Sequence, residues 1–112
     1  MHLTPGILRA AYEFLRATPP FRGWGMPDGD AVAFRVMRHK DLRGQCFWDN
    51  GRPVIDVSAK NVGHTDNLLQ TMAHEMVHIH LDRNGVRSDH GADFRAGAVA
   101  VCRHHGWDVK LF

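Results

Sequence analysis

The feature that most constrains how this chain can fold is a polar stripe along residues 66–83. At about 100° per residue, the helical period puts apolar side chains on one broad arc; these are Leu68, Leu69, Met72, Ala73, Met76, Val77 and Ile79. The remaining arc carries Asn67, Thr71, His74, Glu75, His78 and Asp82, with no lysine and no arginine. A solvated helix face usually carries Lys, Glu and Arg. We therefore predict a largely buried helix whose polar stripe has a specific role.

The stripe contains the pattern His74-Glu75-Met76-Val77-His78. Side chains four residues apart lie on one face of a helix, so both imidazoles can bind one metal ion. The carboxylate of Glu75 can reach a metal-bound water without ligating the metal. We predict a zinc site with His74 and His78 as ligands and Glu75 as general base. The alternative is a solvated stripe with two idle histidines, in a chain that has nine.

A catalytic zinc ion usually has three protein ligands and one open position. A metzincin would continue with Gly and His where this chain has Leu81 and Asn84. No glutamate follows Glu75, which excludes the downstream glutamate ligand of thermolysin-like enzymes. His80 points about 120° away from His74 around a helix and cannot join the same metal ion.

His90 is the predicted third ligand. It lies twelve residues beyond His78, after the helix stop signal Asn84-Gly85, at the expected start of the next helix. The positive end of a helix favours the neutral imidazole that a metal ion needs. The weaker candidates are Asp89, Asp93, His104 and His105.

The pentad followed by His90-Gly91-x-x-Phe94 resembles the SprT-like (Spartan) zinc metalloproteases, which have H-E-M-hydrophobic-H, a short loop and then H-G-x-x-F. Residues 52–58 resemble the strand before their active helix, and residues 66–73 resemble the approach to the motif. The likeness is strongest over residues 52–107. It implies peptide-bond hydrolysis with Zn²⁺ held by His74, His78 and His90, with Glu75 as general base.

Many members of that family add a C-terminal zinc ribbon or DNA-binding segments. This chain has no C-x-x-C pair, so we expect a minimal form of the domain. The expected partner is a protein or peptide substrate. DNA is a possible second partner because relatives act near it, but its targeting is left open.

Composition fits one small globular domain, residues 1–112, with 44% hydrophobic and 23% charged residues. No apolar run approaches the roughly twenty residues needed to cross a bilayer, so we expect no membrane partner. The N-terminus lacks the pattern of a signal peptide. We expect Cys46 and Cys102 to be buried free thiols and the protein to be cytoplasmic. A net charge of +2 is too small to argue for nucleic-acid binding by itself.

The pattern along the chain predicts an α+β fold. Thr4 and Pro5 begin a first helix with an apolar stripe, and Thr18-Pro19-Pro20 ends it; the stripe is Ile7, Leu8, Ala11, Phe14 and Leu15. A loop over 21–30 leads to β-segments near 31–38, 44–48 and 53–58. Turns at 41–44 and 49–51 would connect them into a three-stranded antiparallel sheet. The metal-binding helix, 66–83, a further helix, 89–105, and a strand or tail over 107–112 follow.

Several residue sets allow two interpretations. The basic cluster Arg35, Arg38, His39, Lys40 and Arg43 is either a solvated hairpin edge, which we favour, or a nucleic-acid contact. The set Phe21, Trp24, Met26, Phe47 and Trp48 is either core, which we favour, or the lining of a cleft. Asn67, Thr71 and Asp82 are either hydrogen-bond partners of the imidazoles or capping and solvated groups. Possible oxyanion donors are Arg87, His64 and His104, and the sequence does not choose between them.

Three functions are compatible with these patterns. The leading hypothesis is a zinc-dependent endopeptidase. The second is a non-catalytic, zinc-stabilised module that binds nucleic acid or a protein. The third is a zinc hydrolase with a small-molecule substrate.

Overall fold

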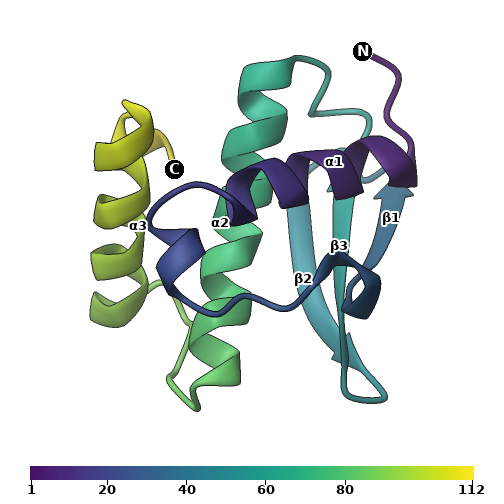
Figure 1. The fold of residues 1–112 in the computed structure, drawn as a ribbon. Helices are drawn as coiled ribbons and strands as arrows, with labels where there is room; N and C mark the ends of the chain where they lie inside the picture. Colours follow the sequence, from purple (N-terminus) through teal and green to yellow (C-terminus); the bar gives the residue numbers. More distant parts are fainter.

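The computed structural model describes all residues, 1–112, and has the predicted α+β architecture (Figure 1). It contains three helices, three strands and the short 3₁₀ turns η1, η2 and η3. In chain order the elements are α1 (Pro5–Arg16), η1 (Phe21–Gly23), η2 (Gly29–Ala31), β1 (Ala33–Met37), β2 (Gly44–Asp49), β3 (Arg52–Ser58), α2 (Thr65–Arg83), α3 (Ala92–His105) and η3 (Val109–Leu111).

Helix α1 begins and ends as predicted. The Thr4 hydroxyl accepts a hydrogen bond from the Ile7 amide at 3.1 Å, which caps the helix. The predicted apolar stripe is wrong at one position, because Phe14 is 53% exposed. Tyr12 is buried instead, and its hydroxyl donates to the Pro27 carbonyl. The predicted stripe did not include Tyr12, whose phenol can be buried because a backbone acceptor satisfies its hydroxyl.

The three-stranded sheet is mixed, so the prediction of a purely antiparallel sheet is wrong. Strands β2 and β3 form the expected hairpin, with Asn50 and Gly51 at positive φ in its turn. Strand β1 pairs in parallel with β3, and the strand order is β1-β3-β2. The reason is the burial of β3, whose residues from Pro53 to Ser58 are all buried. A strand of this kind lies between two neighbours rather than at an edge.

The segment 38–43 therefore crosses the end of β3 instead of forming a tight turn. Ser58 and Asn61, which lie at and beyond the end of β3, hold this crossing. The Ser58 amide donates to the Arg43 carbonyl at 2.8 Å, and the Ser58 hydroxyl donates to the His39 carbonyl. The side-chain amide of Asn61 donates to the Leu42 carbonyl at 2.7 Å. These contacts fix the loop next to the first residues of β2.

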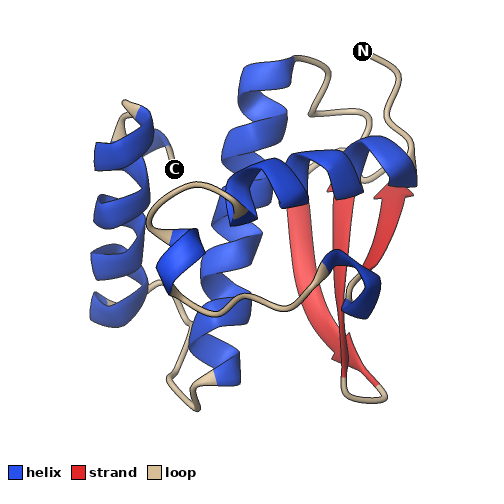
Figure 2. Ribbon diagram, viewed as in Figure 1, coloured by secondary structure: helices blue, strands red, loops and turns tan.

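One face of the sheet supports the hydrophobic core. Phe34, Cys46 and Ile55 are cross-strand neighbours and so share this face. The Tyr12 ring of α1 packs against Phe34 with ring centroids 5.4 Å apart, and buried Met76 of α2 belongs to the same cluster as Ile55. Figure 2 shows α1 crossing the sheet, and α2 lying between the sheet and α3.

On the other face, Asp56 is 1% exposed because Arg35 and Gln45 bond to it from both neighbouring strands. This alternation places Gly44, Cys46 and Trp48 of edge strand β2 toward α2. No helix is both long and apolar enough to span a membrane.

Candidate metal centre

The middle of the polar stripe of α2, from Thr71 to His78, lies beside strand β2. Thr71 and Glu75 are each 5% exposed, and His74 and His78 are half-buried. The opposite side of α2 is fully buried in the core, as its apolar arc predicts. Helical geometry thus places two imidazoles and a carboxylate beside the sheet edge.

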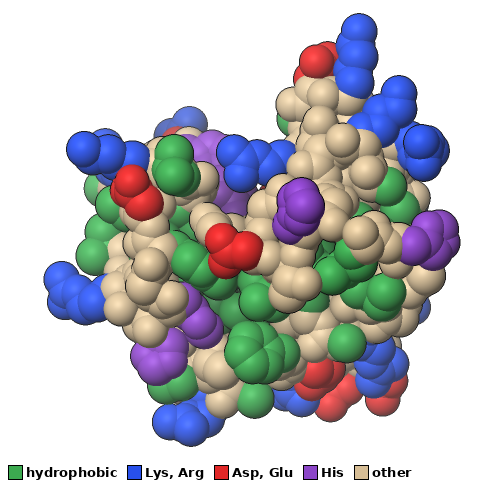
Figure 3. All heavy atoms as spheres, turned by 90° about the horizontal axis from the view of Figure 1, so that it is seen from above, with side chains coloured by type: hydrophobic (Ala, Val, Ile, Leu, Met, Phe, Trp, Pro, Cys, Tyr) green, Lys and Arg blue, Asp and Glu red, His purple; other side chains and the backbone are tan.

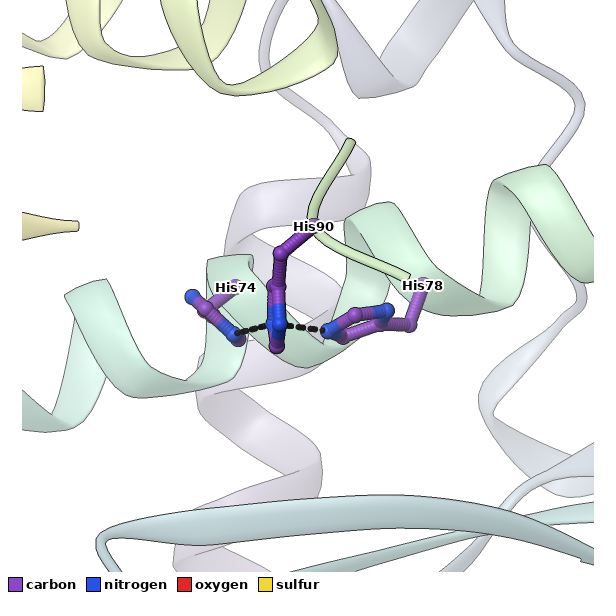
Figure 4. A group of neighbouring side chains, drawn as sticks. All are labelled: His74, His78 and His90. Carbon is purple, nitrogen blue, oxygen red and sulfur yellow. Dashed lines mark hydrogen bonds between the residues drawn. The ribbon is translucent and has the colours of Figure 1, made fainter. Parts of the chain in front are cut away.

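His90 comes to the same place from the segment 84–91, between α2 and α3. It does not lie at a helix start as predicted, because α3 begins at Ala92 with Gly91 as its N-cap. His90 instead has φ of 64°, an uncommon conformation for a residue with a side chain. Its side chain is turned back toward α2 (Figure 4).

The three imidazoles converge on one point. The Nε2 atom of His90 lies 3.1 Å from Nε2 of His74 and 2.9 Å from Nε2 of His78. Candidate ligand atoms of the three residues all lie within 4.8 Å of one another. Zinc with Zn–N bonds of 2.0–2.1 Å in a tetrahedron separates its nitrogen ligands by about 3.3 Å. The cluster therefore has the size and the donor atoms of a single metal site, and these three histidines can hold a metal ion.

A backbone oxygen orients one of the rings. Nδ1 of His74 lies 3.1 Å from the backbone oxygen of Phe112, and the backbone of Ser88 lies beside His78. We assign the N–H to Nδ1 of His74 from this contact, which leaves the lone pair on Nε2. Of the two alternatives for 107–112, strand or tail, the structure has a tail with the turn η3, and this tail supplies the acceptor for His74.

Both helix imidazoles favour the neutral form. Burial, together with His78 and His90 nearby, lowers the pKa of His74 to about 4. Burial and His90 also lower the pKa of His78, although Ser88 and Asp82 oppose the shift. A metal ion binds the neutral imidazole, so this environment suits a metal site near neutral pH.

Phe94 forms an apolar support beneath the cluster. Its ring centroid lies 4.8, 4.6 and 4.7 Å from those of His74, His78 and His90, and the residue is 5% exposed. One rigid side chain of α3 thus contacts all three imidazoles. It restricts the positions that their rings can adopt.

Glu75 is placed beside the histidines but points toward β2. Burial raises the pKa of its carboxyl to about 7, and a hydrogen bond with Cys46 partly opposes that rise. Gly44 leaves the carboxylate room, because a Cβ there would lie 3.3 Å from Oε2 of Glu75 and 2.9 Å from Cγ2 of Thr71. A carboxyl that titrates near pH 7 can both accept and release a proton.

Two hollows meet at His74 and Glu75. One, of about 240 Å³, extends past Arg43 and Leu42 to Leu111. The other, of about 310 Å³, is lined by all three histidines. Together they open both sides of the histidine cluster to solvent. The hydroxyl of Thr71, at the first hollow, has no hydrogen-bond partner.

The proposed oxyanion donors do not lie at this site. Arg87 is paired with Asp89 at 2.8 Å, His64 caps the start of α2, and His104 is exposed on α3. Arg43 lines the first hollow and makes no ion pair. The sequence placed it only in the basic cluster, because its position at the cleft follows from the crossing loop, which was not predicted.

For most of the other residues with two interpretations, the structure distinguishes between them. Asn67 accepts from the His64 amide and caps α2, whereas Asp82 bonds to Ser88 and Trp48 and not to an imidazole. Phe21 and Met26 are core residues, as favoured. Trp48 faces α2, but Phe47 lies on the other side of β2, so the aromatic set does not line one cleft. Cys46 and Cys102 are free; Cys102 is buried and Cys46 half-buried.

Residues 17–110 match the model of the SprT-like family, which covers nearly the whole chain. No curated protein matches the sequence. The matched range includes the sheet, α2, α3 and all three clustered histidines.

Proposed function

We propose that this chain, which belongs to the SprT-like family, is a zinc-dependent endopeptidase. The single observation that carries the proposal is the position of Glu75 and three imidazoles beside a free sheet edge. Residues 1–112 would act as one domain, because α1 contributes to the same core as α2 and the sheet.

Three imidazoles with converging Nε2 atoms match the ligand set of a catalytic zinc ion. His74, His78 and His90 would hold it. When bound, zinc would polarise the scissile carbonyl and lower the pKa of a water molecule at the site. The three imidazoles would place the zinc ion between Glu75 and the segment 84–91.

Glu75 would be the general base and then the general acid. In its ionised form it takes a proton from the attacking water, and it then delivers that proton to the leaving amine. Its carboxylate is largely buried beside Gly44, at the point where the two hollows meet. Arg43 at the first hollow would donate hydrogen bonds to the substrate on the same side.

The free edge of β2 favours a peptide over a small molecule. Strand β2 pairs only with β3, so its other edge has unpaired backbone N–H and C=O groups. That strand runs beside the hollow that contains the histidines. An extended substrate segment can add to such an edge through main-chain hydrogen bonds, which also places its peptide bonds beside Glu75.

The test is the Glu75→Gln variant assayed on an unfolded, casein-like protein. We expect cleavage to fall by roughly 10²–10⁴-fold, the usual contribution of a general base, while bound zinc and folding persist. Removing zinc with a chelator should abolish cleavage by the parent protein. Glu13→Gln is the matched control, because Glu13 lies on α1 away from the cleft. Unchanged cleavage by Glu75→Gln would show that the role of Glu75 is wrong.

A second candidate is a zinc-stabilised module that binds nucleic acid. Three side chains of the predicted basic cluster, Arg38, Lys40 and Arg43, are exposed and make no ion pair. Arg35 is paired with Asp56, so its charge is already neutralised within the protein. On the face drawn in Figure 3, however, Lys and Arg side chains lie around the rim with hydrophobic side chains exposed between them. This candidate predicts zinc binding without proteolysis, and salt-sensitive DNA binding lost in Arg38→Glu/Lys40→Glu.

A further inference from the structure

The segment 84–91, which carries His90, makes few hydrogen bonds to the rest of the protein beyond its first three residues. Amides of its first residues bond to the end of α2, including Val86 to the Leu81 carbonyl at 2.9 Å. Residues 87–90 make no backbone–backbone hydrogen bond. Arg87 and Asp89 pair only with each other, and both are exposed. The conformation of this segment therefore depends on few side-chain contacts.

Asp82, in the last turn of α2, provides one of those contacts. Its Oδ1 atom accepts a hydrogen bond from the Ser88 hydroxyl at 2.7 Å. Its Oδ2 atom accepts from Nε1 of Trp48 at 3.2 Å. One carboxylate thus joins α2, edge strand β2 and the segment that carries His90. Apart from the imidazole of His90, only the hydroxyl of Ser88 gives residues 87–90 a hydrogen bond to another element.

Ser88 transmits this contact to two of the histidines. Its backbone lies beside the imidazole of His78, and it precedes His90 by two residues. Asp82, Ser88, His78 and His90 line the same hollow. Holding Ser88 therefore fixes the backbone beside one imidazole and the start of the turn that brings the other imidazole back to α2.

We propose that Asp82 is a positioning residue that acts through Ser88 to hold His90 and His78 in their metal-binding arrangement. This inference rests on the proposed zinc site. Asp82 itself would not touch the metal ion or the substrate. The carboxylate is suited to the task because each oxygen accepts one bond, and Trp48 fixes its orientation from the sheet side.

The competing interpretation is that these are ordinary surface hydrogen bonds with separate, small effects. Additivity distinguishes the two. If Asp82 acts through Ser88, removing Ser88 leaves Asp82 with nothing further to contribute. The double variant should then be no worse than either single variant.

The experiment measures zinc affinity of the full chain by competition with a chelator, for Asp82→Ala, Ser88→Ala and the double variant. Each is expected to weaken zinc binding by roughly 10–100-fold, as loss of a partner of the ligands usually does. Ser88→Thr, which keeps the hydroxyl, should remain close to the parent. Asp66→Asn, at the other end of α2, is the control for loss of one carboxylate from the same helix.

A change in zinc affinity below twofold for Asp82→Ala, or a double variant equal to the product of the single effects, would overturn the proposal. Hydrogen exchange of amides 86–91 in the metal-free protein provides a measurement independent of zinc. It should become faster in Asp82→Ala and Ser88→Ala but not in Asp66→Asn; equal exchange in all four proteins would also overturn it. If the parent binds no zinc, the proposed function fails, while this exchange result still decides the role of Asp82.

Discussion

The two parts of the protein that supply the clustered histidines are held in different ways. His74 and His78 belong to a 19-residue helix whose apolar side is fully buried and whose polar stripe faces β2. His90 belongs to an exposed segment with a left-handed residue and few hydrogen bonds. Regular structure places two of the imidazoles, and isolated side-chain contacts place the third.

Because of this difference, folding stability and metal binding depend on different parts of the protein. Helix α2 must be formed for the core to exist, because Met72, Met76 and Ile79 are fully buried in it. The segment 84–91 contributes little to the core beyond half-buried Val86. Substitutions on the buried side of α2 or against it should thus affect folding, whereas loss of His90 from 84–91 should affect metal binding alone.

The largest expected effect is on metal binding in His90→Ala. Loss of a direct ligand should weaken zinc binding by more than the roughly 10–100-fold typical of a lost partner of a ligand. The metal-free variant should nevertheless unfold at the same denaturant concentration as the metal-free parent, because His90 is exposed. Zinc competition and chemical denaturation measure the two quantities. Equal zinc affinity in parent and variant would contradict the ligand role.

A large effect on folding is expected from Gly44→Ala, because Gly44 of β2 faces α2. The added Cβ would lie 2.9 Å from Thr71 Cγ2 and 3.1 Å from the Asp56 carbonyl oxygen. Such overpacking should lower the free energy of unfolding by about 1–3 kcal/mol. Gly63→Ala is a suitable control, because nothing lies within 4 Å of a Cβ there. Equal stability of the two variants would show that the strand and helix can separate freely.

A smaller, pH-dependent effect should come from Glu75. Its carboxyl has a pKa of about 7 in the folded metal-free protein, against an ordinary value of 4.5. Between these values the folded state binds more protons than the unfolded state, so folding becomes less favourable as pH rises. Metal-free parent protein should therefore lose stability relative to Glu75→Gln from about pH 4.5 to pH 7. Denaturation of both proteins across this range measures the difference; a constant difference would argue that Glu75 is not buried.

The smallest effect is expected from Arg87→Ala, in the middle of the exposed segment. The Arg87 side chain is 86% exposed and pairs with Asp89 within the same segment. Such a pair usually contributes about 0–1 kcal/mol. Zinc affinity and unfolding should both remain close to the parent. A marked loss of zinc binding would mean that this ion pair, and not the Asp82–Ser88 contact, holds the segment.

The part of the site that lies on helix α2 is also the part that the amino-acid sequence predicts. Period and spacing alone place His74, Glu75 and His78 on one stripe of a helix, and the α+β fold is confirmed. The convergence of His90 with them is also found in the structure, although its place before α3 is not as predicted. The ligand and base roles of these residues stay predictions.

Tertiary contacts explain what the sequence did not predict. The parallel pairing of β1 with β3 requires a loop that crosses the end of β3, and the contacts of Ser58 and Asn61 with that loop have no local sequence pattern. The same loop brings Arg43 to the cleft. The acceptor for His74 is a backbone oxygen of Phe112, and a backbone group carries no signal in the residue type.

The most direct test of the account is X-ray absorption at the zinc edge of the zinc-loaded parent protein. Three imidazoles around one ion predict nitrogen ligands at about 2.0–2.1 Å, with one further light atom and no sulfur. A sulfur ligand at about 2.3 Å, or fewer than three imidazoles, would contradict the arrangement of His74, His78 and His90.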